Sequence, residues 1–84
     1  MKVEIEFNYL NYVTMIQCNT QDNFQKIFQS FANKANIDIN TVYFLYSGII
    51  LDENSTIEQK INTNDKEIKK MNILVNNKDE SKEN

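Results

Sequence analysis

The pattern near the start of the chain is that of a strand hairpin. Over residues 3–7, three apolar side chains alternate with two glutamates, a period of two that predicts a strand with one buried face. Residues 8–11 supply two Asn suited to a turn. Residues 12–18 are rich in β-branched and aromatic side chains, so we expect them to return as a second strand.

The register of this second strand has two alternatives, because a shift of one residue exchanges its two faces. The two candidate inward sets are Tyr12, Thr14, Ile16 and Cys18, or Val13, Met15 and Gln17. We favour the first set because it places no Gln in the core.

A helical period replaces the alternation after residue 23. The apolar positions then fall at i, i+3, i+4, i+7 and i+11, which is one stripe of an amphipathic helix. The stripe consists of Phe24, Ile27, Phe28, Phe31 and Ala35. Asp22 and Gln25 have the spacing of a capping box, so we expect Asp22 to be the N-cap. Asn36 is suited to end the helix, because Asn tolerates the left-handed conformation.

The middle of the chain predicts another strand and a tight turn. Residues 41–46 have the composition of a strand and run into Ser47-Gly48, which is followed by three more aliphatic residues. Gly48 is the only Gly in the sequence. Because Gly accepts a positive φ without a steric clash, we expect a hairpin or a sharp corner at this point.

The rest of the chain is more polar. We expect a polar loop over residues 52–55 and a short helical turn over 56–61, with Ile57 and Ile61 on one side. A second loop over 62–70 and a last strand over 71–75 should follow. From Asn76 onward the sequence has no apolar residue. Such a segment cannot bury enough surface to offset its ordering entropy, so we expect a domain over 1–76 and a disordered polar tail or linker over 77–84.

These elements together predict a two-layer α+β fold. One main α-helix packs across one face of a mixed sheet of four to five strands. The sheet residues expected to meet the helix stripe are Val3, Ile5, Phe7, Ile16, Phe44 and Ile73.

Composition favours a binding module over an enzyme. A chain of 84 residues holds one small core with little room for an enclosed pocket. Without His there is no imidazole base, no Ser-His or Cys-His pair and no His-bearing zinc site. The single cysteine, Cys18, is expected to be an inert core residue of a protein from a reducing compartment. Glu4 and Glu6 are interpreted as a solvated strand face, so we expect no catalytic residue, metal or cofactor.

Charge excludes other partners. The net charge is −3, and the nine basic residues, all Lys, are scattered along the chain, which is unlike a nucleic-acid-binding protein. The sequence has no apolar run near the roughly 18 residues of a membrane helix, and no signal-peptide pattern at its start. We therefore expect a cytoplasmic or nuclear monomer that binds neither nucleic acid nor membrane.

From Met1 to about Val75 the chain resembles ubiquitin and the ubiquitin-like domains. The resemblance rests on the N-terminal hairpin, the helix stripe, and four short motifs: Asn36-Ile37, Tyr46-Ser47-Gly48, Leu51-Asp52-Glu53 and Thr56-Ile57. It implies a β-grasp fold.

The resemblance also implies an aliphatic docking patch on the sheet face opposite the helix. In the family, the residue just before the motif of an aromatic residue, a small residue and Gly contributes to the patch. In this chain the motif is Tyr46-Ser47-Gly48, and the residue before it is Leu45. Alternation independently turns Tyr43 and Leu45 outward on one strand and Leu74 outward on the last strand. Leu10 stands where the family often keeps a further apolar contact. The candidate patch is thus Tyr43, Leu45, Leu74 and Leu10, against the alternative of incidental exposure.

A departure from the family pattern concerns the C-terminus. Family members that are conjugated end in Gly-Gly, whereas the only Gly here is Gly48. We therefore expect a non-catalytic interaction domain that docks on ubiquitin receptors, the proteasome or another complex, by way of a ubiquitin-binding helix or domain. The alternative is a divergent modifier whose processed C-terminus is missing or lost.

Overall fold

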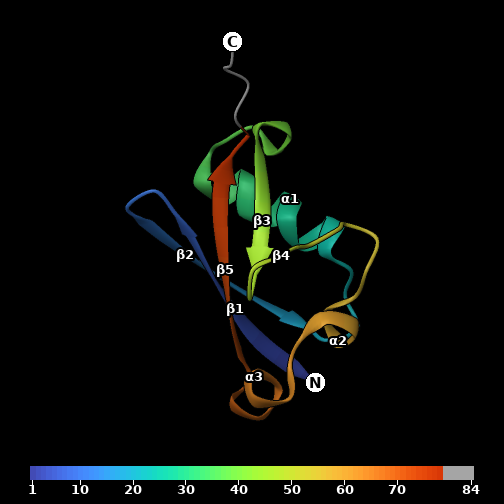
Figure 1. Ribbon diagram of the computed structural model, residues 1–84. Helices are drawn as coiled ribbons and strands as arrows, with labels where there is room; N and C mark the ends of the chain where they lie inside the picture. The colour runs from blue at the N-terminus through green and yellow to red at the C-terminus, as the bar shows by residue number, and fades with distance from the viewer. Residues whose placement is uncertain (79–84) are drawn as a thin grey trace.

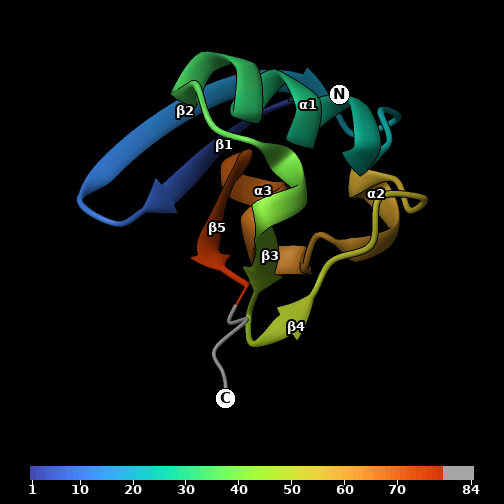
Figure 2. The ribbon, with the colours of Figure 1, turned by 90° about the horizontal axis from the view of Figure 1, so that it is seen from above.

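A computed structural model describes residues 1–78, which form a five-stranded mixed sheet with a helix across one face (Figures 1 and 2). The elements are β1 (Lys2–Tyr9), β2 (Tyr12–Asn19), α1 (Phe24–Ala35), the 3-10 turn η1 (Ile39–Thr41), β3 (Val42–Tyr46), β4 (Ile49–Ile50), α2 (Ile57–Lys60), α3 (Thr63–Ile68) and β5 (Lys70–Asn77). The strand order is β2-β1-β5-β3-β4. The β1–β5 pair is parallel, and the other three pairs of named strands are antiparallel. Within residues 1–78, no helix is long and apolar enough to cross a membrane.

The hairpin of β1 and β2 has the favoured register. Val3 lies opposite Cys18 and Ile5 opposite Ile16, so the even-numbered residues of β2 share the face of the buried β1 residues. Ile16 and Cys18 pack against the core but stay partly exposed. The favoured face is therefore confirmed for Ile16 and Cys18, whereas Tyr12, which was also expected to point inward, is 72% exposed because it lies next to the hairpin turn. β2 is an edge strand that the helix covers only in part.

The helix stripe packs on the sheet as expected. Phe24, Ile27, Phe28 and Phe31 are buried, and Ala35 is partly buried. The rings of Phe28 and Phe44 stack with centroids 3.8 Å apart, and those of Phe7 and Phe31 with centroids 4.6 Å apart. The core is therefore an aromatic layer between α1 and the inner face of the sheet.

The helix begins one residue later than expected. Its N-cap is Asn23, whose side chain accepts from the Lys26 N–H at 3.2 Å. Asp22 instead accepts from the Asn19 N–H at 3.0 Å through its carboxylate, and from the Ile57 N–H at 3.1 Å through its carbonyl. Asp22 is thus held in the turn after β2, and the expectation that it caps the helix was wrong. At the other end Asn36 is left-handed with φ 60°, which confirms it as the helix stop.

A helix, α3, lies where the sequence predicted a loop over residues 62–70. Polar contacts hold it. The Asn62 side chain accepts from the Asp65 N–H at 2.7 Å, and Lys69 ends the helix in a left-handed conformation. Ile68 is exposed, so α3 has no apolar stripe by which the sequence could reveal it.

The last strand is longer than expected. It extends to Asn77, and its residues Asn76 and Asn77 lie opposite Tyr43 and Val42 of β3. The remainder of the predicted tail, residues 79–84, lies outside the described residues.

Candidate docking surface

In residues 1–78, α1 covers one face of the sheet and no helix covers the other (Figures 1 and 2). On the free face, three apolar side chains from adjoining strands form a row. Leu45 lies opposite Leu74 of β5 on one side and opposite Ile50 of β4 on the other. Tyr43 stands two residues from Leu45 on the same face of β3. We call Tyr43, Leu45, Ile50 and Leu74 the sheet-face patch.

The members of the sheet-face patch are open to solvent to different degrees. Ile50 is 64% exposed and Leu74 is 49% exposed, whereas Leu45 and Tyr43 are partly buried between their neighbours. The buried residues of β3 alternate with these two, as the sequence indicated. Three of the four residues predicted for a docking patch therefore lie together.

The fourth predicted residue, Leu10, lies apart. It occupies the turn of the β1–β2 hairpin, two residues beyond Asn8, which is the β1 neighbour of Leu74. Leu10 is 69% exposed and adopts a positive φ of 56°. In Figure 1 the tip of this hairpin projects to one side of β5. Leu10 is thus an exposed apolar residue beside the patch and not in its row.

The predicted patch left out three apolar residues on the same face of the sheet, namely Ile50, Val13 and the partly buried Met15. Ile50 was passed over because β4 has only two residues, too few to show a period. The signal that could have found it is its place between the turn at Gly48 and the buried Leu51. Val13 of β2 is exposed and lies opposite Asn8 of β1. The row that ends at Leu74 therefore continues across the polar Asn8 to Val13. The favoured register of β2 already turned Val13 outward.

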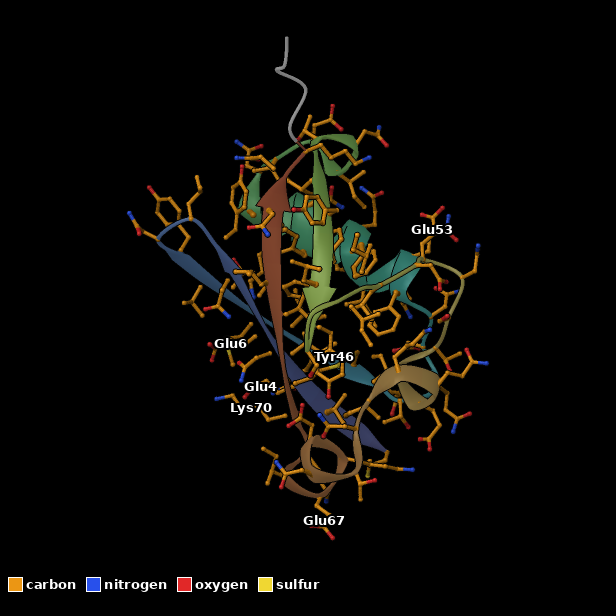
Figure 3. The ribbon with its side chains drawn as sticks, viewed as in Figure 1. Glu4, Glu6, Tyr46, Glu53, Glu67 and Lys70 are labelled. Carbon is orange, nitrogen blue, oxygen red and sulfur yellow. The ribbon has the colours of Figure 1, made fainter. Side chains whose placement is uncertain are left out.

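Charged side chains stand on the same face beside β1. Glu4 and Glu6 alternate there with buried residues, and the Lys70 Nζ lies 3.6 Å from the Glu6 Oε1 (Figure 3). Both glutamates are partly exposed. An exposed ion pair of this kind contributes little to stability.

The thiol of Cys18 has the features of a structural group. It packs against the core, with its Sγ 3.9 Å from the Val3 carbonyl oxygen. Burial, together with the nearby Asp22 carboxylate, raises the pKa of Cys18 to about 11. The thiolate is the nucleophilic form of cysteine, and the raised pKa favours the thiol form of Cys18 at neutral pH.

Tyr46 also serves the fold. Its hydroxyl donates to the Asp65 Oδ2 at 2.5 Å and accepts from the Asn62 N–H at 3.0 Å, so it joins β3 to the start of α3 (Figure 3). Burial raises the pKa of Tyr46 to about 12, and the Asp65 carboxylate acts in the same direction. The Tyr46 side chain is buried, and its hydroxyl forms its hydrogen bonds with Asp65 and Asn62.

Comparison with known proteins identifies the fold. The sequence matches no protein-family model and no curated protein. Among solved structures, the ubiquitin of Caldiarchaeum subterraneum has a TM-score of 0.76 with this chain, covering 93% of it and 95% of that ubiquitin, at 8% sequence identity. A likeness at that identity shows the fold alone. Together with the strand order and the helix across one face, it establishes that the chain has a ubiquitin-like β-grasp fold.

Proposed function

We propose that this chain is a non-catalytic interaction domain that docks on an amphipathic helix of a ubiquitin receptor or proteasomal receptor. The observation that carries the proposal is the row formed by Leu74, Leu45 and Ile50 on the free face of the sheet. Isolated exposed apolar side chains are ordinary on protein surfaces. Neighbouring ones from three strands, with Tyr43 beside them, favour an interaction site.

The spacing of the row suits a helix as the partner. Neighbouring strands are about 4.8 Å apart, and successive turns of an α-helix are about 5.4 Å apart. A helix laid across the strands therefore brings one apolar residue of each turn against one strand. Its stripe would contact Leu74, Leu45 and Ile50 in order.

The chemistry of the other candidate groups supports binding over catalysis. Cys18 has a raised pKa and packs against the core, and Tyr46 is committed to Asp65 and Asn62. Glu4 and Glu6 stand on a strand face, where Lys70 pairs with Glu6. In the described part of the chain, no group of three or more acidic or Cys side chains could hold a metal ion.

The proposal is tested by mapping the contact surface. The isotope-labelled chain is titrated with a helical ubiquitin-interacting peptide while its amide resonances are followed by NMR. We expect shifts at Leu45, Ile50 and Leu74, and none on the outer face of α1 at Gln29 and Asn33. A peptide of the same composition with its apolar stripe scrambled is the control. Shifts centred on α1, or equal shifts with the scrambled peptide, would contradict the proposal.

A further inference from the structure

The strand β2 is one edge of the sheet, and among residues 1–78 it pairs only with β1. In an antiparallel pair, positions that exchange hydrogen bonds alternate with positions that do not. The Thr20 N–H donates to the Met1 carbonyl at 2.9 Å, so the even-numbered positions of β2 are the bonded ones. The backbone N–H and C=O groups of the odd-numbered residues therefore point out from the edge: Val13, Met15, Gln17 and Asn19.

The strand β2 itself has none of the features that usually protect a sheet edge. Such an edge is a template for pairing with another chain, and proteins commonly protect it with charged side chains, Pro or a bulge. The eight residues of β2 include no charged residue and no Pro. Their register with β1 runs without a break from Tyr12 to Asn19, so there is no bulge. Protection of this edge must therefore come from outside the strand.

Two neighbouring segments close two positions of the β2 edge. At its end, the Asn19 N–H donates to the Asp22 Oδ2 at 3.0 Å, and the Asn19 carbonyl accepts from the Asp22 N–H at 2.9 Å. In the middle, Lys34 of α1, the helix beside β2 (Figure 2), donates from its Nζ to the Met15 carbonyl oxygen at 2.9 Å. The remaining open stretch is residues 13–17, with the Lys34 ammonium group at its midpoint.

This open stretch matches itself in a second copy of the chain. An antiparallel pair of β2 strands would have its two-fold axis at Met15, with Val13 of each copy opposite Gln17 of the other. No charged side chain of β2 opposes that arrangement. Lys34 does, because the two Met15 carbonyls needed for the central hydrogen bonds are already taken, and because both ammonium groups would meet at the axis.

We propose that Lys34 keeps β2 from pairing with the β2 strand of a second copy of this chain. Its ammonium group occupies the central carbonyl of the open edge and places a positive charge where the two copies would meet. This inference does not depend on the proposed docking function, because the sheet-face patch lies on β3, β4 and β5.

The other charged side chains near β2 are less well placed for this role. Lys2, Glu4 and Glu6 lie on β1, which is one strand spacing, about 4.8 Å, further from a second copy. The Lys26 Nζ lies 3.9 Å from the Asp22 Oδ1, next to the end of the edge that the Asp22 turn already closes. Among these groups, Lys34 is the one that bonds to the open edge.

The test removes the Lys34 side chain and measures self-association by sedimentation over a series of concentrations. A dimer of Lys34→Ala no longer has to break two ammonium–carbonyl hydrogen bonds, so we expect it to form about tenfold more tightly than a dimer of the parent. Hydrogen exchange at the Val13, Met15 and Gln17 amides should slow as its concentration rises. Lys34→Arg keeps the charge and the donor and should associate no more than the parent.

Lys26→Ala is the matched control, because it removes the same side chain from the same helix. Each Ala variant makes the net charge of −3 one unit more negative, which by itself weakens self-association. Stronger association of Lys34→Ala alone therefore supports the proposal. A loss of stability would speed exchange at the β2 amides instead of slowing it. The proposal is overturned if Lys34→Ala associates no more than the parent, if both Ala variants associate equally, or if exchange slows only outside β2.

Discussion

Leu10 is in a conformation that does not suit its residue type. Its φ of 56° lies in the left-handed region, which costs a residue with a Cβ roughly 1 kcal/mol or more. Its side chain is largely exposed, so burial does not offset this cost. The two-residue hairpin turn between Tyr9 and Tyr12 requires a positive φ, so the turn imposes this conformation on Leu10.

We expect Leu10→Asn to raise the free energy of unfolding by about 0.5–1 kcal/mol, because Asn tolerates the left-handed region better than Leu does. Urea unfolding measures the change. Val13→Asn is the control, since Val13 is also exposed but lies in regular β2 and should gain nothing. A Leu10→Asn variant no more stable than the parent would show that the turn carries no strain.

Among the elements, the strands differ in how far the helix covers them. Ile73 lies on β5, between β1 and β3, and is fully buried. Ile16 faces the same side from the edge strand β2 and is only partly buried. The cost of truncating an aliphatic side chain grows with the cavity that is left behind. The two Ile residues should therefore differ sharply.

We expect Ile73→Ala to lower the free energy of unfolding by about 3–4 kcal/mol, and Ile16→Ala by no more than about half of that. The two variants remove the same atoms, so each serves as the control for the other in denaturant unfolding. Equal losses would contradict the partial cover of β2.

The short helix α3 depends on a side chain from another element. Tyr46 of β3 supplies the hydroxyl that bonds to both Asp65 and Asn62 at the start of α3. We expect Tyr46→Phe to lower the free energy of unfolding by about 1–2 kcal/mol and to speed hydrogen exchange in α3. An unchanged exchange rate at Asp65 would show that α3 holds itself without Tyr46.

The same hydroxyl gives a dependence on pH. The pKa of Tyr46 is raised from 10.0 to about 12 by folding, so its proton is held more tightly in the folded chain. The stabilisation is complete below about pH 10 and is lost as pH rises toward about 12. The stability difference between the parent and Tyr46→Phe should thus narrow between about pH 10 and about pH 12. A constant difference would contradict the raised pKa.

These elements also show which parts of the fold and of the candidate site can be predicted from the sequence. Periodic segments, such as the α1 stripe around Phe28 and the alternation of β3, were predictable because one apolar face of each is buried. The helix α3 was not, because it is held by Asn62 and by the distant Tyr46 rather than by a stripe. In the site, alternation placed Leu45 and Leu74 outward. The contribution of Ile50 depended on a pairing across a turn, which no local period reveals.

At the scale of the whole molecule, one helix layer covers one face of the sheet. A chain of this size has a core on one side of the sheet only, and the other side meets solvent (Figure 2). On that open side Leu74 and Ile50 are largely exposed, and Leu45 between them is only partly buried. Leu74, Leu45 and Ile50 are therefore available for a partner, and this is the central claim about function.

The affinity of Leu74→Ser for a helical ubiquitin-interacting peptide, relative to that of Ile68→Ser, tests this claim most directly. Both substitutions remove an exposed aliphatic side chain, one from the sheet-face patch and one from α3, and both should leave the free energy of unfolding within about 0.5 kcal/mol of the parent. We expect Leu74→Ser to bind the peptide about tenfold more weakly and Ile68→Ser to bind it as the parent does. Equal affinities for the two variants would contradict docking through the sheet-face patch.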